Sequence, residues 1–128
     1  MELMWSDAFE HCVAVDAETA EALAYVSVRR TNLIYGVAYI EGVDIAHVDI
    51  GDISPVIDML IRRLFERTAI RKLYFEDFGE GFLSQWRPSL RTPRGRLAAH
   101  RLIDGTYRDL NISSVSRSTA EEHLRVIA

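Results

Sequence analysis

Cysteine is nearly absent from the sequence, which contains Cys12 and no other. A single cysteine cannot form an intrachain disulfide, so a disulfide-stapled secreted scaffold is excluded. The apolar neighbours Val13 and Val15 predict that the thiol of Cys12 is buried and inert. The four histidines show no ligand spacing with one another or with Cys12, which predicts that the chain holds no metal.

Long apolar runs and an excess of positive charge are also missing. No stretch approaches the roughly 18 apolar residues of a membrane span, and the first ten residues lack the basic and apolar parts of a leader. The formal net charge is -4, so the chain as a whole is not attracted to nucleic acid or to anionic membranes. These absences predict a cytoplasmic protein without a membrane partner and argue against nucleic acid as a ligand.

What the chain does contain suits one folded core. It has 128 residues, of which 48% are hydrophobic and 27% are charged, close to the averages of globular proteins. No linker, repeat or low-complexity segment divides it. We therefore expect a single domain over residues 1–128.

Segments rich in β-branched and aromatic residues predict a series of strands. They lie at 11–16, 22–30, 33–45 and 70–78. A long loop with one helical turn around 83–86 is expected over 79–95, because glycine and proline recur there. After it, Asp104-Gly105 predicts the turn of a closing β-hairpin.

One amphipathic helix is predicted at 55–67. Its apolar residues follow the i, i+3, i+4, i+7, i+8 spacing of a buried face and are Ile57, Leu60, Ile61, Leu64 and Phe65. Ser54 is expected to cap this helix, with Pro55 at its first position. Ser118 with Glu121 resembles a capping box and predicts a short helix at the end of the chain.

Two segments carry a resemblance to a known family, FERTAIRKLYFED at 65–77 and GRLAAHRLIDGTYRDL at 95–110. They resemble stretches of the GNAT acyltransferases, particularly the branch that acetylates ribosomal-protein N-termini. The resemblance implies an α/β (α+β) fold, with a mixed, mostly antiparallel sheet around one central amphipathic helix. Because the likeness begins at the family's second strand, it also implies that the first strand and the two helices after it are missing.

The resemblance further implies acetyl-CoA as the acyl donor. The family's diphosphate-binding loop falls on the segment VDIGDI, in which Gly51 is retained. Val48 stands in place of the family's Arg or Gln, and Ile53 in place of a small residue. Asp49 and Asp52 add negative charge where phosphate oxygens would lie.

Candidate site residues follow from the same alignment and from one basic stretch. Glu41 and Asp44 end a strand that in GNAT enzymes often carries a carboxylate able to assist removal of the amine proton. Five arginines lie between residues 87 and 101 without an intervening acidic residue, and guanidinium groups bind phosphate well. The expected cofactor-binding residues are Ile45, Gly51, Ser54, Arg87 and Arg91. Ordinary structural roles, as exposed strand ends and a solvated basic loop, remain the alternative for all of them.

Two functions are therefore considered. The first is acyl-CoA-dependent N-acyl transfer to a small-molecule or peptide amine, assisted by Glu41 or Asp44. The second is a non-catalytic or repurposed GNAT-like binding domain, with a homodimer covering the face that the missing N-terminal elements leave open.

Overall fold

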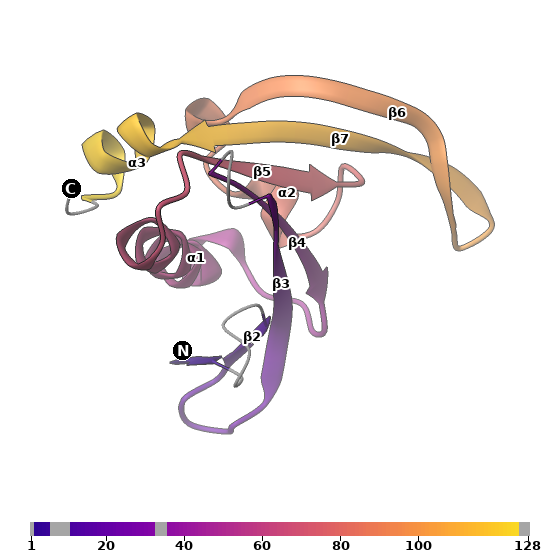
Figure 1. Cartoon of the computed structure of the whole chain (residues 1–128). Helices are drawn as coiled ribbons and strands as arrows, with labels where there is room; N and C mark the ends of the chain where they lie inside the picture. Colours follow the sequence, from indigo (N-terminus) through magenta and orange to yellow (C-terminus); the bar gives the residue numbers. More distant parts are fainter. Residues whose placement is uncertain (1, 6–10, 33–35, 126–128) are drawn as a thin grey trace.

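A computed structural model describes residues 2–5, 11–32 and 36–125 of the chain. Its seven strands form one sheet, in the order β1-β2-β3-β4-β5-β7-β6 (Figure 1). The strands are β1 (Glu2–Trp5), β2 (His11–Val15), β3 (Ala22–Asn32), β4 (Val37–Asp44), β5 (Lys72–Asp77), β6 (Thr92–Ile103) and β7 (Thr106–Ser116). Neighbouring strands are antiparallel except β4 and β5, which run parallel. The mixed, mostly antiparallel α/β architecture expected from the sequence is confirmed.

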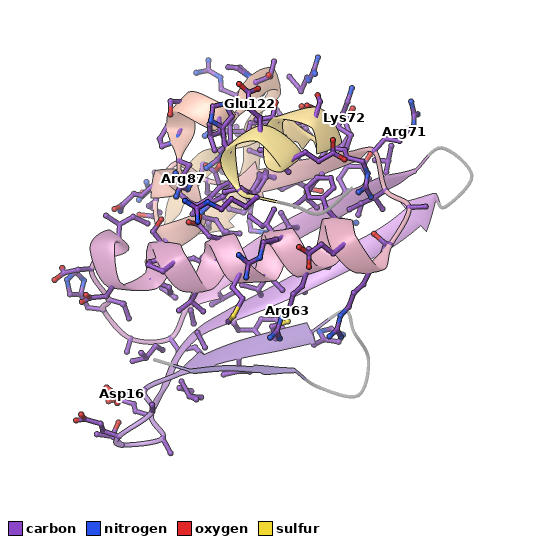
Figure 2. The ribbon with its side chains drawn as sticks, turned by 90° about the vertical axis from the view of Figure 1, so that its left-hand side faces the viewer. Asp16, Arg63, Arg71, Lys72, Arg87 and Glu122 are labelled. Carbon is purple, nitrogen blue, oxygen red and sulfur yellow. The ribbon has the colours of Figure 1, made fainter. Side chains whose placement is uncertain are left out.

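The parallel pair β4 and β5 is joined by the long helix α1 (Ile50–Arg67), which lies lengthwise across one face of the sheet (Figure 2). Its buried residues form one stripe, consisting of Ile53, Val56, Ile57, Leu60, Ile61, Leu64 and Phe65. They pack against the side chains of β3, β4 and β5 that alternate toward the same face, such as Val28, Ile40 and Leu73. This layer is the core of the protein.

The predicted start of this helix is wrong. The helix begins at Ile50 with Asp49 as its N-cap, and Pro55 lies inside it instead of at its first position. Ile53 is fully buried one turn before Ile57, so the apolar stripe continues back past the proline. Burial of this extra turn outweighs the single backbone hydrogen bond that Pro55 cannot donate.

The structure adds a strand ahead of the first predicted one, because Glu2–Trp5 forms β1 and pairs with β2. Four residues are too few to show a clear alternation of apolar and polar side chains, so the sequence does not indicate this strand. It forms by pairing along the edge of β2. Residues 6–10 and 33–35 lie outside the described residues, including the part of the predicted 33–45 strand that precedes β4. Between β1 and α1, the described segments contain strands and turns but no helix.

Three short helical segments complete the fold, and two of them follow β5. They are α2 (Phe82–Gln85), the 3-10 turn η1 (Pro88–Leu90) and the terminal helix α3 (Arg117–His123). The N-cap of α3 is Ser116, whose hydroxyl accepts the N–H of Thr119, and not the predicted Ser118. The cap is shifted because β7 continues directly into this helix.

The last two strands form a long hairpin arm that extends past the end of β5 and bends at its tip (Figure 1). Asp104 and Gly105 both have positive φ angles, 49° and 77°, as a type I′ turn requires, so the predicted turn is confirmed. From Leu97 to Leu110 the two strands pair only with each other, and Leu102 and Tyr107 are exposed. We refer to residues 97–110 as the arm.

Close packing of α2 on β4 requires a glycine at residue 42. A Cβ atom added there would lie 2.5 Å from Phe82 Cζ and 2.9 Å from Leu83 Cδ1. We therefore expect Gly42→Ala to lower the free energy of unfolding by about 1–3 kcal/mol, through overpacking. Urea unfolding measures the change, and Gly95→Ala is the matched control because nothing lies within 4 Å of its added Cβ. Equal stability of the two variants would show that α2 does not pack closely against Gly42.

Candidate active site

The candidate site lies where two parallel strands separate. β4 and β5 are paired from Val37 to Ile40 on one strand and from Lys72 to Phe75 on the other. Beyond this point β4 pairs only with β3, and β5 only with β7, so the strands diverge (Figure 1). The divergence leaves the backbone of the second half of β4 without a strand partner on the side facing β5.

Helix α2 packs into this opening. Phe82 and Leu83 are buried and approach the backbone of Gly42, as described above. The first N–H of the helix, that of Phe82, donates to Asp44 Oδ1 at 3.2 Å. Gly81, with φ 89°, allows the chain to pass the same carboxylate, because a Cβ there would lie 3.0 Å from Asp44 Oδ1. Asp44 therefore anchors α2 to β4.

Between the diverging strands lies a cleft of about 750 Å³. Its lining comes from β3, β4, the end of β5, α2 and the tip of the arm. Six of the lining residues carry carboxylates, and one carries a guanidinium group. They are Glu41, Asp44, Glu76, Asp77, Glu80 and Asp104, with Arg101. Three of these carboxylates, Glu76, Asp77 and Glu80, are paired with arginines that do not line the cleft. The other three still outnumber the single Arg101, so the cleft favours a cationic ligand over an anionic one.

The structure brings both predicted catalytic carboxylates, Glu41 and Asp44, into this cleft. They differ in their surroundings. Both are exposed, but Asp44 accepts the first backbone N–H of α2, whereas Glu41 accepts from the Ser27 hydroxyl at 3.5 Å. A third carboxylate, Glu76, is paired with Arg29 at 2.5 Å. Glu41 is thus the carboxylate of the three best placed to meet a ligand.

Three of the predicted cofactor-binding residues lie near the ends of β4 and α1. Ile45 follows β4, is 54% exposed, and donates its backbone N–H to Leu23 O at 3.0 Å. Gly51 and Ser54 lie in the first two turns of α1 and do not line the cleft. The space beside Gly51 is open, since nothing lies within 4 Å of a Cβ added there. The neighbouring Asp49 side chain is 81% exposed and lies 3.6 Å from His47 Nε2.

The other two, Arg87 and Arg91, are bound to carboxylates of the protein itself. Arg87 donates to both oxygens of Asp58, from Nε at 2.8 Å and from Nη2 at 2.7 Å, beside α1 (Figure 2). Burial alone would raise the pKa of Asp58, but hydrogen bonds from Arg87 and from the Trp86 indole outweigh it and lower this pKa. The hydrogen bond from Arg87 to Asp58 in turn raises the pKa of Arg87.

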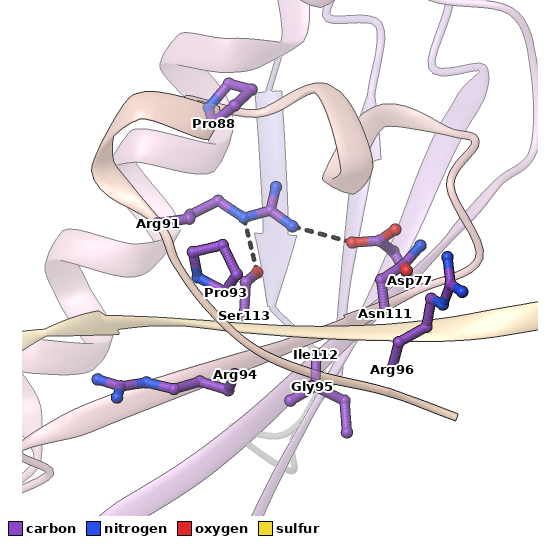
Figure 3. Close-up of a pocket in the computed structure, with 10 residues that line it drawn as sticks. All are labelled: Asp77, Pro88, Arg91, Pro93, Arg94, Gly95, Arg96, Asn111, Ile112 and Ser113. Atoms are coloured by element: carbon purple, nitrogen blue, oxygen red, sulfur yellow. Dashed lines mark hydrogen bonds and ion pairs between the residues drawn. The ribbon is translucent and has the colours of Figure 1, made fainter. Parts of the chain in front are cut away.

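Arg91 is the more deeply buried of the two. Its side chain is 7% exposed and pairs with Asp77 at 2.9 Å, while its Nε donates to the Ser113 hydroxyl at 3.0 Å (Figure 3). It also donates to the carbonyl oxygens of Leu83 and Trp86, which hold the end of α2. Burial lowers the pKa of Arg91, and the charge of Asp77 opposes that shift. A second hollow of about 520 Å³ lies beside this pair, at the start of β6.

Sequence reasoning missed the cleft residues of β3 and β5, namely Tyr25, Ser27 and Glu76. Alternation along each strand indicates that Tyr25 and Ser27 share a face. It does not give the register that places Ser27 opposite Glu41, or the divergence that brings Glu76 to the same cleft. Cys12 is buried as predicted, and burial raises the pKa of its thiol to about 12.

Comparison with known proteins identifies the fold. Neither a family model nor a curated protein sequence matches the chain. Among solved structures, the N-terminal domain of a ribosomal-protein-alanine acetyltransferase from Clostridium acetobutylicum is similar at a TM-score of 0.72 and 9% identity, over 88% of this chain and 86% of that one. A mutant of the spermidine N-acetyltransferase SpeG from Vibrio cholerae is similar at a TM-score of 0.70 and 18% identity, over 86% and 66%.

The chain therefore has the GNAT fold, and it spans just under two thirds of the Vibrio enzyme's length. At these identities the likeness concerns the fold alone. In the segments 2–5, 11–32 and 36–125, no three His, Cys, Asp or Glu side chains are arranged so that they could hold a metal ion together. Within the same segments, none of the helices combines the length and apolar character needed to cross a bilayer.

The buried pair Arg91–Asp77 leads to a test of its structural role. We expect Arg91→Met to cost about 3–5 kcal/mol of unfolding free energy, because the buried Asp77 carboxylate then lacks its partner. The more exposed pair provides the control, since Arg87 is 40% exposed and Arg87→Met should cost clearly less. Both values come from urea unfolding at neutral pH. Similar losses in the two variants would contradict the assignment of Arg91 as the buried anchor of α2.

Proposed function

We propose that the chain transfers an acyl group from a coenzyme A thioester to an amine. The observation that carries this proposal is the cleft at the divergence of β4 and β5, with Glu41 beside an unpaired strand edge. The GNAT fold of the chain supports it, and so do the two similar structures described above, which are acetyltransferases. The donor supplies the activated acyl carbon when it is bound.

The second half of β4 fits the amide-containing arm of such a donor. An extended ligand can form main-chain hydrogen bonds with a strand edge that has no partner. Val43 and Ile45 are exposed on this stretch, at 58% and 54%, and offer apolar contact along it. The backbone from Glu41 to Ile45 would therefore hold the donor, as the family resemblance also implies.

The diphosphate end of the donor fits less well. The space beside Gly51 at the start of α1 is open, and the N-terminus of an 18-residue helix favours an anion. Asp49 and Asp52 oppose this attraction, and Ser54 lies too far along the helix to act as its cap. Arg87 and Arg91 could bind the diphosphate only if their ion pairs with Asp58 and Asp77 were broken. The affinity for the donor should therefore be modest.

The acceptor fits the charge of the cleft. An amine enters as its ammonium form, which the carboxylates around Glu41 attract. Glu41 would hold this group beside the thioester and assist removal of its proton, directly or through water. Asp44 would act by fixing α2, because its carboxylate is bound to the Phe82 N–H. The spermidine N-acetyltransferase among the similar structures makes polyamines a natural first acceptor to test.

The proposal predicts binding and turnover that depend on Glu41. Acetyl-CoA at a hundred times its dissociation constant should stabilise the protein by roughly 2.7 kcal/mol, measured by thermal unfolding. Release of free thiol with primary alkylamines, spermidine included, measures transfer, and Glu41→Gln should lower kcat/KM about 10²-fold. Glu18→Gln, a carboxylate outside the cleft, is the control. An unchanged melting temperature at millimolar acetyl-CoA would contradict the proposal and favour a binding domain without this chemistry.

Removing the acidic residues at the start of α1 should strengthen binding of the donor. Replacing both aspartates, in the variant Asp49→Asn/Asp52→Asn, should tighten acetyl-CoA binding by about 2–5-fold for each charge removed, because repulsion of the diphosphate is relieved. The gain should shrink at high salt, since both groups are solvent-exposed. Calorimetric titration at two salt concentrations measures it. Unchanged affinity would place the diphosphate away from this helix.

A further inference from the structure

Two carboxylates at the start of α1 are left unused by the fold. Asp49 is the N-cap residue, but its side chain forms no capping hydrogen bond and is 81% exposed. Asp52 is exposed three residues further on, so the two carboxylates share one side of the first turn. Among the residues that the structure describes, the side chain of Asp52 has no hydrogen-bond or ion-pair partner. Both charges suit the helix dipole, but both also face any ligand that approaches from solvent.

Positive charge that could offset these carboxylates is scarce. Asp49 lies 3.6 Å from Nε2 of His47, an exposed imidazole that is charged only when protonated. Arg87 and Arg91, the arginines expected to bind a diphosphate, are held by carboxylates of the protein instead. A diphosphate beside the start of α1 would therefore be repelled, and the repulsion would weaken with salt because both aspartates are exposed.

The edge of β4 suits an uncharged ligand. In the described sheet, the second half of β4 lacks a strand partner on the side facing β5. Val43 and Ile45 are exposed along this stretch and carry no charge. An extended chain with amide groups fits such an edge, because it can form main-chain hydrogen bonds and cover the apolar side chains. The pantetheine arm of a thioester donor has this chemistry.

The uncharged edge leads directly to the acidic turn. Residues 45–49 connect the end of β4 to the start of α1. A donor whose thioester lies beside Glu41 and whose arm follows β4 past Ile45 therefore brings its far end toward Asp49 and Asp52. In coenzyme A the far end of the arm carries the diphosphate, whereas free pantetheine ends there in a hydroxyl group. The two parts of coenzyme A thus meet opposite environments.

The second hollow, at the start of β6, does not offer the diphosphate another place. β5 and β7 separate β6 from β4, so this hollow lies across the sheet from the edge that would hold the donor. The arginines around it are also engaged, because Arg91 and Arg96 both pair with carboxylates. Arg94 donates from Nε to the Ser114 hydroxyl at 2.8 Å and extends away from the other two arginines (Figure 3).

We propose that the site selects a pantetheine thioester without a diphosphate as its acyl donor, and that Asp49 and Asp52 are specificity-determining residues that disfavour coenzyme A thioesters. This inference rests on the proposed N-acyl transfer and refines the identity of its donor. Coenzyme A thioesters remain donors, because they contain the same arm and the same thioester, but they bind more weakly. The start of α1 acts here by repulsion and holds no ligand.

The chemical step is the same for both donors. After the ammonium group has lost one proton through Glu41 to solvent, the lone pair of the neutral amine forms a bond to the acyl carbon. The C–S bond breaks with its electron pair on sulfur, and a second proton from nitrogen ends on that sulfur. The products are an amide and a free thiol. Because the whole arm separates the diphosphate from the thioester, discrimination should appear in KM while kcat stays similar.

The test compares acetyl-CoA with S-acetylpantetheine as donors for one primary alkylamine, by release of free thiol. For the parent protein, the KM of S-acetylpantetheine should be lower than that of acetyl-CoA, and the difference should narrow at high salt. The variant Asp49→Asn/Asp52→Asn should lower the KM of acetyl-CoA by about 2–5-fold for each charge removed. The same variant should leave the KM of S-acetylpantetheine unchanged.

A matched control removes the same charge at the other end of α1. Glu121 and Glu122 lie on α3, whose Arg117 donates to the carbonyl oxygen of Thr68, the C-cap residue of α1. Glu121→Gln/Glu122→Gln should therefore leave both KM values unchanged. Thermal unfolding of the two double variants confirms that they are folded.

The outcomes separate this inference from the function on which it rests. A lower KM for acetyl-CoA than for S-acetylpantetheine in the parent protein would overturn the inference while leaving N-acyl transfer intact. An equal response of both donors to Asp49→Asn/Asp52→Asn would do the same. If neither donor releases thiol with the alkylamine, the proposed function fails, and the inference fails with it.

Discussion

The divergence of β4 and β5, held open by α2, is the constraint on which the site depends. Two parallel strands that remained paired would leave no space between them and no free backbone edge. Phe82 and Leu83 fill the base of the opening, and the approach of Phe82 to Gly42 leaves no room for a larger residue. Asp44 fixes the start of α2 and Arg91 fixes its end. The cleft is thus shaped by residues that do not themselves need to meet a ligand.

The charged residues of the chain divide between these two tasks. The arginines nearest α2 are used to hold the scaffold together, as the pairs Arg91–Asp77 and Arg87–Asp58 show. The carboxylates left facing the cleft, Glu41 foremost, give it a negative lining. The arginine-rich stretch that begins at Arg87 looks like an anion site in the sequence, but Arg87 and Arg91 bind carboxylates of the protein itself. Acidic residues that are far apart in the sequence converge on the candidate site instead.

The sequence predicted most elements of the fold, because their signals are local. The i, i+3, i+4 pattern identified the central helix, and the Asp104-Gly105 pair identified the final hairpin. The start of α1 was wrong because burial of Ile53, a tertiary effect, outweighs the usual position of a proline. The family resemblance led correctly to the GNAT fold, but it could not show that Glu2–Trp5 adds a strand at the sheet edge.

The candidate site was only partly predictable. Glu41 and Asp44 could be placed on one strand end, and both line the cleft. The contribution of Tyr25 depends on the register between β3 and β4, and that of Arg91 on a contact with Asp77 14 residues away. Such pairings arise from chain topology, and a single sequence carries no local signal for them.

The arm has a consequence for the motions of the molecule. Two strands bonded only to each other, without a third strand or a helix over them, are marginally stable in water. Residues 97–110 can therefore separate and re-form without disturbing the layer between α1 and the sheet. Because Arg101, Ile103 and Asp104 at the tip line one end of the cleft, the conformation of the arm determines the size of molecule that can enter.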